Sequence, residues 1–311
     1  MCCRVIQPGM LTTVQDLGRT GLANMGVPPG GAADAFSFSI ANRLAGNDQA
    51  APALECTLTG PTLRFDTDAT VAITGAPAEV HLDHQPVAQW TDLLVQRGQT
   101  LRVGAARAGC RMYVAARGGF QIPRVLGSAS TLLSAGFGGI DGRPLRTGDQ
   151  LALQPGDHPL ARTPDLKSAE SFLTRRIVRA IEAPLENRFD RGAAEQFWST
   201  IWTVSNRSDR MGVRLEGPGV ATLCAGRMTS EGMPHGAVEI PADGQPIALG
   251  VEHPTTGGYP PIACVATIDL PLLGQLRPRD SVRFQRITRE EALALLREQT
   301  HQIDLLFSSR G

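Results

Sequence analysis

Short segments in which apolar and polar residues alternate dominate the chain, and glycine or proline residues separate them. This alternation is typical of β-strands with one buried face, because successive side chains of a strand point to opposite sides of the sheet. With 34 Gly and 22 Pro, turn residues are frequent enough to end each segment after a few residues. Strands are predicted over residues 70–74, 93–96, 100–103, 111–116, 150–153, 202–205, 213–216, 246–250 and 281–284. The pattern predicts a mainly β protein with few helices.

Helical periodicity occurs in two places. Residues 34–44 place Phe36, Ile40 and Leu44 four residues apart on one face, and Gly46 follows as a helix terminator. A second helix is predicted over residues 292–296, where Thr288 and Glu291 have the spacing of a capping box.

One segment pattern occurs twice and divides the chain. Residues 145–153 and 276–284 both read Leu-Arg-x-x-Asp-x-apolar-x-apolar, which predicts a turn that leads into a final strand in each half. The polar, proline-bearing stretch after the first copy is typical of a linker. We therefore expect a first lobe over residues 1–155, a linker over 156–174, a second lobe over 175–287, and a C-terminal helix and tail over 288–311.

The charge balance bears on possible partners. The 30 basic and 30 acidic residues cancel, so no net field draws the chain toward nucleic acid or an anionic membrane. No apolar run approaches the roughly 20 residues that span a bilayer, and residues 1–10 lack the apolar core of a secretion signal. The expectation is a cytoplasmic protein that binds neither nucleic acid nor membrane.

The composition also excludes several chemistries. The six cysteines lie at positions 2, 3, 56, 110, 224 and 264 without a Cys-x-x-Cys pair, which favours reduced thiols over a disulfide framework or a zinc site. Lys167 is the only lysine, and no glycine loop precedes it. A Walker phosphate loop and a Schiff-base lysine are therefore not expected, and the surrounding residues do not resemble a biotin attachment site.

Five polar segments that contain or adjoin glycines are the candidate chemical sites. They are residues 12–19, 30–34, 205–212, 230–232 and 255–259. Glycine lets a backbone approach a ligand and direct N–H groups at it, and arginine can grip a carboxylate with two hydrogen bonds. The same residue types also form ordinary ion pairs in turns. Glu55, within an apolar strand-like run, is either paired with an arginine or positioned for chemistry with a raised pKa.

Histidine spacing gives little support for a metal site. His81 and His84 lie three residues apart, but the sequence there predicts a strand that enters a hairpin turn, which directs the two rings apart. His253 lies beside the last polar segment, where a surface position is the simpler interpretation. No metal site is predicted.

A series of motifs in one order resembles a known family. The series begins with Pro-Gly-x-x-Thr-Thr-Val-Gln-Asp-x-Gly-Arg over residues 8–19 and continues through Ser-Asp-Arg-Met-Gly at 208–212, Ser-Glu-Gly at 230–232, Asp-Gly-Gln-Pro at 243–246 and Thr-Thr-Gly-Gly-Tyr at 255–259. The chain resembles the KipA family, which comprises the C subunits of 5-oxoprolinase and is also called the allophanate hydrolase subunit 2 family. That family is similar to the carboxyltransferase region of urea carboxylases.

This resemblance implies a fold, partners and a reaction. It implies two cyclophilin-like β-barrel lobes in tandem and a complex with two further subunits, one KipI-like and one LamB/YcsF-like. The complex would open 5-oxoproline, a cyclic amide, to glutamate, with ATP bound somewhere in the complex and no biotin on this chain. Two other functions stay open: a carboxyltransferase that acts on urea or a related amide with biotin carried on another chain, and a non-enzymatic regulator that binds a KipI-like kinase inhibitor.

The resemblance also implies roles for individual residues. The catalytic candidates are Asp16, Glu231 and Arg210. The substrate-binding candidates are Arg19, Asp34, Glu55, Ser208, Asp209, Gln245, Thr255, Thr256, Gly257, Gly258 and Tyr259. The chain departs from the family pattern in having Glu239 in place of glutamine, Glu-His-Pro at 252–254 in place of Asp-x-Gln, and Arg279 in place of glycine. The first two departures lie beside the candidate site and bear on the choice of substrate.

Overall fold

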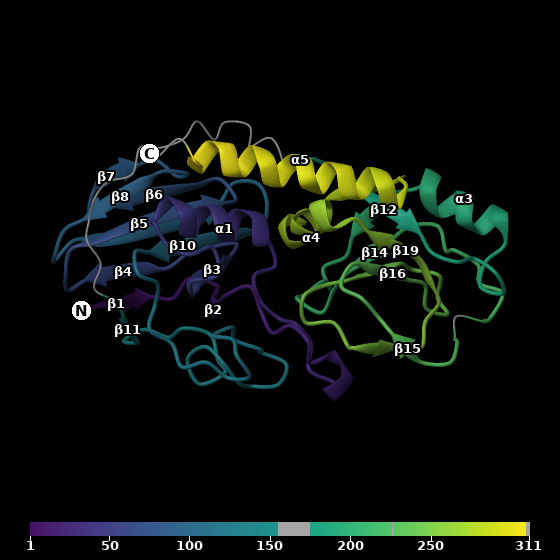
Figure 1. Cartoon of the computed structure of the whole chain (residues 1–311), viewed down its shortest axis with the longest axis horizontal. Helices are drawn as coiled ribbons and strands as arrows, with labels where there is room; N and C mark the ends of the chain where they lie inside the picture. Colours follow the sequence, from purple (N-terminus) through teal and green to yellow (C-terminus); the bar gives the residue numbers. More distant parts are fainter. Residues whose placement is uncertain (155–174, 226, 309–311) are drawn as a thin grey trace. The chain divides into compact units, whose positions relative to one another are not determined.

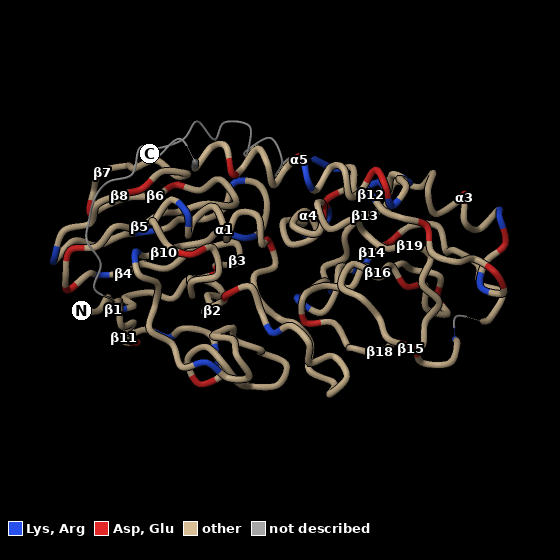
Figure 2. Tube along the Cα trace, viewed as in Figure 1, with Lys and Arg blue, Asp and Glu red and all other residues tan. Residues whose placement is uncertain are grey.

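The computed structural model describes residues 1–154, 175–225 and 227–308 (Figure 1). The predicted linker over 156–174 lies outside these residues. The chain divides into two compact units. Unit 1 contains residues 1–19, 30–174 and 306–311, and unit 2 contains residues 20–29 and 175–305. Charged residues of both signs are distributed through both units (Figure 2).

Unit 1 contains two antiparallel sheets. The six-stranded sheet has the order β11-β1-β4-β9-β6-β7 and the five-stranded sheet the order β2-β3-β10-β5-β8. The strands are β1 (Cys2–Gln7), β2 (Leu11–Gln15), β3 (Ala53–Thr57), β4 (Thr62–Phe65), β5 (Ala69–Gly75), β6 (Ala78–Leu82), β7 (Gln85–Val87), β8 (Asp92–Val95), β9 (Thr100–Ala106), β10 (Arg111–Ala116) and β11 (Gln150–Ala152). The sheets share one hydrophobic core, to which Phe65 and Leu101 contribute from one sheet and Ile73 and Val114 from the other.

A helix explains why two strands of unit 1 are buried on both faces. Helix α1 (Ala35–Leu44) packs on β5 and β10, and both strands are buried along their whole length. Tyr113 on β10 meets Phe38 of α1 edge-on, with ring centroids 5.8 Å apart. Because the second face of the sheet is covered as well as the first, these strands lose the alternation seen in half-buried strands.

Unit 2 is a closed barrel of seven strands in the order β12-β19-β16-β17-β14-β13-β20. Its strands are β12 (Ile177–Glu182), β13 (Ile201–Val204), β14 (Gly212–Glu216), β16 (Ala237–Glu239), β17 (Ile247–Leu249), β19 (Pro261–Val265) and β20 (Ser281–Arg286). Among the barrel pairs, β12 and β20 are parallel and the others antiparallel. A separate two-stranded ladder joins β15 (Glu231–Gly232) to β18 (Thr256–Gly257).

The helices of unit 2 are α3 (Arg191–Ser199), α4 (Leu270–Gln275) and α5 (Arg289–Ser308), which runs from unit 2 into the last residues of unit 1. Two short 3-10 turns also lie in this unit, η1 (Ala23–Met25) and η2 (Thr267–Asp269). Helix α3 packs on β20, where Phe197 stacks on Phe284 with ring centroids 4.9 Å apart. None of the helices within the described ranges is long and apolar enough to cross a membrane.

The predicted fold class is confirmed, and the predicted strands are all present with small shifts at their ends. Asp34 caps α1 by accepting a hydrogen bond from the Ser37 backbone N–H at 2.9 Å, and Thr288 and Glu291 form the predicted capping box. The sequence patterns missed α3 and α4. Helix α4 has only six residues and a proline in its first turn, so it is too short to show helical periodicity.

The two repeated segments form the same turn. The Asp149 carboxylate accepts a hydrogen bond from the Arg146 N–H at 2.8 Å, and the Asp280 carboxylate accepts one from the Arg277 N–H at 3.0 Å. The residue before each aspartate has a left-handed backbone, with φ of 93° at Gly148 and 74° at Arg279. This conformation costs a non-glycine residue about 1–2 kcal/mol, so the glycine-to-arginine departure places a strained residue in the second turn.

We expect Arg279→Gly to raise the free energy of unfolding by about 0.5–1 kcal/mol, because the relieved backbone strain exceeds the added flexibility of the unfolded chain. Urea unfolding at neutral pH measures the change. The matched control is Gly148→Ala, since an added Cβ there meets nothing within 4 Å and tests the backbone alone. This control should lower the free energy of unfolding by about 1 kcal/mol. A lower stability of Arg279→Gly would contradict the interpretation.

Candidate functional site

Asp16 lies in a closed set of hydrogen bonds in unit 1. Its carboxylate accepts hydrogen bonds from the hydroxyls of Ser128 and Ser130, both at 2.6 Å, and from the backbone N–H groups of Gly18 and Ala129 at 2.8 and 2.7 Å. The residue is 3% exposed. These contacts join the end of β2 to a loop more than a hundred positions later in the chain, so Asp16 holds the loop in place. Its predicted role in turnover stays a prediction.

The other candidates in unit 1 are also hydrogen bonded within the framework. Arg19 donates to the carbonyl oxygens of Val125 and Ser130 and lies over the ring of Phe137, 4.8 Å from the centroid. Asp34 caps α1 through the N–H and hydroxyl of Ser37. Each of these side chains therefore fixes a loop or a helix end.

Glu55 is paired with an arginine and a tyrosine. Its carboxylate accepts hydrogen bonds from the Tyr113 hydroxyl at 2.8 Å and from the Ala33 N–H at 2.7 Å, and it lies 3.7 Å from the Arg111 guanidinium. Burial and the Glu55 charge raise the pKa of Tyr113 well above its usual value, so the hydroxyl stays protonated and donates. The arrangement holds the segment before α1 against the sheet.

The polar segment at 205–212 in unit 2 forms a turn and a buried ion pair. Arg210 Nε donates to Glu252 at 2.5 Å, and both side chains are buried. Asp209 accepts from the Met211 N–H at 2.8 Å, and the Ser208 hydroxyl accepts from the Arg214 N–H at 3.0 Å. Gln245 lies outside this segment. Its side-chain amide accepts a hydrogen bond from the Gly217 N–H and donates one to the Gly217 carbonyl oxygen.

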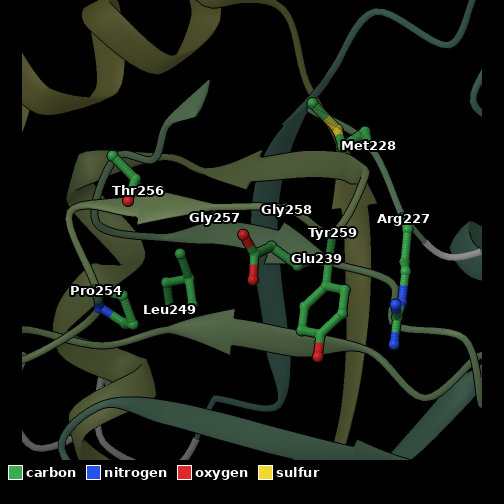
Figure 3. Close-up of a pocket in the computed structure, with 9 residues that line it drawn as sticks. All are labelled: Arg227, Met228, Glu239, Leu249, Pro254, Thr256, Gly257, Gly258 and Tyr259. Atoms are coloured by element: carbon green, nitrogen blue, oxygen red, sulfur yellow. The ribbon is translucent and has the colours of Figure 1, made fainter. Parts of the chain in front are cut away.

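A cavity of about 420 Å³ in unit 2 brings together four of the predicted substrate-binding residues. Its lining is Arg227, Met228, Glu239, Leu249, Pro254, Thr256, Gly257, Gly258 and Tyr259. The volume is within the roughly 300–1,000 Å³ typical of small-molecule sites. Figure 3 shows the Glu239 carboxylate in the middle of this lining, with Leu249 and the Tyr259 ring on either side. Ser208, Asp209, Arg210, Gln245 and Thr255 are not among its lining residues.

Gly257 is required by the position of Glu239. A Cβ built on Gly257 would lie 2.3 Å from Glu239 Oε1 and 2.9 Å from a side-chain carbon of Met233. Neither distance is compatible with a non-glycine residue at this position without movement of the neighbours. The Thr-Thr-Gly-Gly-Tyr motif therefore makes room for the carboxyl group against the backbone of β18.

Glu231 lies beside this cavity on the same ladder. It is the register partner of Gly257 in the β15–β18 pair, and its carboxylate lies 3.3 Å from the Arg188 guanidinium. The side chain is 42% exposed. Solvent reaches this ion pair, so Glu231 is the most accessible of the three predicted catalytic side chains.

Burial controls the chemistry of Glu239. The residue is 5% exposed, and its Oε1 atom has no hydrogen-bond partner among the described residues. Desolvation raises the pKa of the carboxyl from 4.5 to about 7. A neutral carboxyl group both donates and accepts a hydrogen bond, whereas the carboxylate only accepts. At neutral pH the cavity therefore holds a group that can do either.

The histidines do not form a metal site in the described parts of the chain, where no group of three or more His, Cys, Asp or Glu side chains is placed to hold an ion. His81 lies in β6, one residue before the end of the strand, and His84 lies in the turn of the hairpin. His253 is buried, stacks on His235 with ring centroids 6.2 Å apart, and places its Nδ1 2.7 Å from the Pro254 carbonyl oxygen. The pKa of His235 is lowered to about 4 by burial and by His253.

Sequence reasoning missed part of the cavity. The sequence marks Glu239 only as a departure from the family pattern, and the other lining residues that it does not indicate are Arg227, Met228, Leu249 and Pro254. The available signal was a charged residue between apolar neighbours at the end of a short strand. The other residues carry no such signal, because arginine, methionine and proline are common in loops and leucine is common in strands such as β17.

Comparison with known sequences identifies the class of protein to which this chain belongs. A family model described as "Carboxyltransferase domain, subdomain A and B" matches residues 25–286. The chain therefore belongs to this carboxyltransferase domain family.

Within the family, the chain is 38% identical over 305 residues to the C subunit of 5-oxoprolinase from Escherichia coli, and the match covers 97% of both proteins. It is 35% identical over 315 residues to urea amidolyase of Saccharomyces cerevisiae, of which it spans only 17%. The crystal structure of the K. lactis urea amidolyase matches 98% of this chain with a TM-score of 0.90 and 33% identity, and the chain spans 20% of that protein.

The pKa of Glu239 predicts how stability depends on pH. The folded-state pKa of about 7 exceeds the 4.5 of the exposed group. The contribution of the neutral carboxyl group to the free energy of unfolding is therefore fully present below pH 4.5 and is lost as the pH rises to about 7. Glu239→Gln removes this pH-dependent loss of stability, because glutamine does not ionise. We expect the free energy of unfolding of Glu239→Gln, minus that of the wild type, to increase across this window by up to about 3 kcal/mol. Urea unfolding at several pH values measures it, and a constant difference would contradict the burial argument.

The contacts of Asp16 predict a structural loss. Asp16→Ala leaves several buried donors without an acceptor, so we expect the free energy of unfolding to fall by at least about 2 kcal/mol. Ser130→Ala is the matched control, because it removes one hydroxyl from the same network and should cost about 1 kcal/mol. Urea unfolding compares both with the wild type. If Asp16→Ala unfolds at the wild-type urea concentration, the network does not hold the loop.

Proposed function

We propose that this chain is the C subunit of an ATP-dependent 5-oxoprolinase, which opens 5-oxoproline to glutamate together with a KipI-like and a LamB/YcsF-like partner. The observation that carries this proposal is the match to the C subunit of the E. coli 5-oxoprolinase, which covers 97% of each protein. The same chain corresponds to only about a fifth of the urea amidolyase.

The reaction sets a clear physical problem. A lactam is a poor electrophile, and its ring nitrogen is a poor leaving group. In the proposed complex, ATP transfers its γ-phosphoryl group to the amide oxygen and leaves as ADP. Water then adds to the ring carbon, and the C–N bond breaks as the nitrogen takes a proton, which gives γ-glutamyl phosphate. A second water releases phosphate and glutamate.

The cavity around Glu239 suits the recognition part of this chemistry. Arg227 supplies a positive charge for the substrate carboxylate, and the glycines at 257 and 258 let a ligand approach the backbone. Glu239 supplies a group that can hydrogen bond an amide. In this proposal the chain binds and orients the cyclic amide, and the partners complete the active site.

A carboxyltransferase acting on urea or a related amide is the second candidate. The structural match to K. lactis urea amidolyase, with a TM-score of 0.90, favours it. Biotin would have to be carried on another chain, because the sole lysine, Lys167, is not in a biotin attachment sequence.

The two functions differ in their products. We expect the chain, co-expressed and purified with the two partners, to release glutamate from 5-oxoproline only when ATP is present. Gly257→Ala in this chain should lower the rate at least tenfold, because the added Cβ would collide with Glu239. Gly219→Ala is the control, since its Cβ would meet nothing nearer than 3.5 Å. Failure to release glutamate, together with biotin-dependent carboxylation of urea, would favour the second candidate.

A further inference from the structure

One face of the six-stranded sheet of unit 1 is open to solvent. In β1, β4 and β9, buried and exposed positions alternate, so one face of the sheet packs on the core and the other faces outward. The exposed outward positions include Arg4, Arg64 and Arg102. None of the three guanidinium groups forms an ion pair or a side-chain hydrogen bond with another residue in the part of the chain that the structure describes. The outer face of the sheet therefore carries three positive charges that no carboxylate of the described residues neutralises.

The strand register brings these arginines together. Arg4 on β1 lies directly opposite Arg64 on β4, and Arg64 lies opposite Thr100 on β9, two positions before Arg102. Directly opposite residues have Cβ atoms about 5 Å apart, and diagonal neighbours lie about 7–8 Å apart. Like charges in directly opposite positions destabilise a sheet. The unbound sheet therefore holds Arg4 and Arg64 together at a cost in stability.

Acidic side chains in or next to this sheet have other partners. They are Glu79, Asp149, Asp66 and Asp83, which contact Arg107, Arg143, the Cys2 thiol and the Thr100 backbone N–H, respectively. Of these, Glu79 is the one whose charge acts on Arg102. The hydrogen bond from Arg107 is the main cause of the lowered pKa of Glu79, and Arg102 makes the smallest contribution. The arginines are consequently available to an anion from outside the chain.

The composition of the face selects the kind of anion. Phe65 is the only Phe, Tyr or Trp in the six strands, and it is fully buried. Proteins that bind single-stranded nucleic acid on a sheet stack the bases on exposed aromatic rings. The balanced charge of the whole chain gives no long-range attraction to a duplex either. The face instead fits protein carboxylates, which arginine can hold with two hydrogen bonds.

We propose that the arginine face, formed by Arg4, Arg64 and Arg102, is the docking surface for an acidic segment of a partner protein that binds in an extended conformation. Alternate side chains of an extended segment lie on one side and are about 7 Å apart. This spacing is close to that of the arginines across the strands. A carboxylate between two guanidinium groups also relieves the repulsion between Arg4 and Arg64. The inference does not depend on the reaction proposed above.

Fluorescence anisotropy with a labelled peptide of six Glu-Thr repeats tests the inference on the full chain. We expect binding in about 20 mM NaCl that weakens at least about tenfold in about 300 mM NaCl, because salt screens exposed charges. A peptide of six Gln-Thr repeats should bind at least about tenfold more weakly, since its amides carry no charge. A thymidine oligonucleotide with six phosphates should also bind more weakly than the glutamate peptide.

Charge reversal at Arg64 separates docking from a purely structural role. Arg64→Glu should weaken peptide binding at least about tenfold, because the introduced carboxylate repels the peptide. The same substitution should raise the melting temperature of the unbound chain by about 1–3 °C, because it places an opposite charge across from Arg4. Arg297→Glu is the control. It makes the same change in charge at an exposed position of α5 and should leave peptide binding within about twofold of the wild type.

A second variant keeps the test valid if Arg64→Glu melts below the wild type. Arg64→Thr removes the charge with a residue that suits a strand, and it should weaken peptide binding about threefold. Unchanged binding by Arg64→Thr, an equal loss in Arg297→Glu, or no binding of the glutamate peptide at low salt would overturn the inference. Tighter binding of the oligonucleotide would identify a nucleic-acid surface and overturn it as well.

Discussion

Burying a carboxylate costs free energy that hydrogen bonds, a counter-charge or protonation must offset, and this constraint shapes both units. Asp16 meets it with two hydroxyls and two backbone N–H groups. Glu55 meets it with a tyrosine, a backbone N–H and an arginine, and Glu252 with Arg210. Glu239 is different because burial shifts it toward the neutral form. That difference separates Glu239 from the carboxylates that are paired within the framework.

Arginine is the basic partner in the buried ion pairs of Glu55, Glu252 and Asp269. Of the 30 basic residues only Lys167 is a lysine. The guanidinium is planar and stays charged when buried, so it can satisfy a carboxylate inside a barrel or at a sheet end without losing its proton. Arg210 is buried with Glu252, and Arg179 donates to the fully buried Asp269. An ammonium group in such places would have a lowered pKa and would hold the carboxylate less well.

The fold by itself does not select the substrate. The chain superposes on the K. lactis urea amidolyase with a TM-score of 0.90, and yet it is also 38% identical to a protein named for a different reaction. Function depends on the groups placed in the cavity rather than on the barrel that carries them. A glutamate at position 239 makes the hydrogen-bonding capacity of that cavity depend on pH, whereas a glutamine would not. Position 239 is therefore where we look for the specificity of this chain.

The sequence by itself determined the local structure. Alternating side chains predicted a strand within Ser281–Arg286, the four-residue spacing of Phe36, Ile40 and Leu44 predicted the first helix, and the repeated Leu-Arg-x-x-Asp segments predicted two equivalent turns. These features depend on residues close together in the chain, whose geometry follows from backbone periodicity and short-range hydrogen bonds. The polar segment that contains Thr256 and Tyr259 was predicted as a candidate site for the same reason.

Only the tertiary structure decided which polar groups meet. Asp16 and Ser130 are 114 positions apart, and nothing local in either segment specifies the other. Glu239 lies against Gly257 because a barrel strand and a separate ladder come together in space. Whether a carboxyl group is paired, exposed or neutral depends on its desolvation and its neighbours, and both arise from packing between distant segments. The chemistry of Glu239 is therefore a property of the folded unit and not of its place in the sequence.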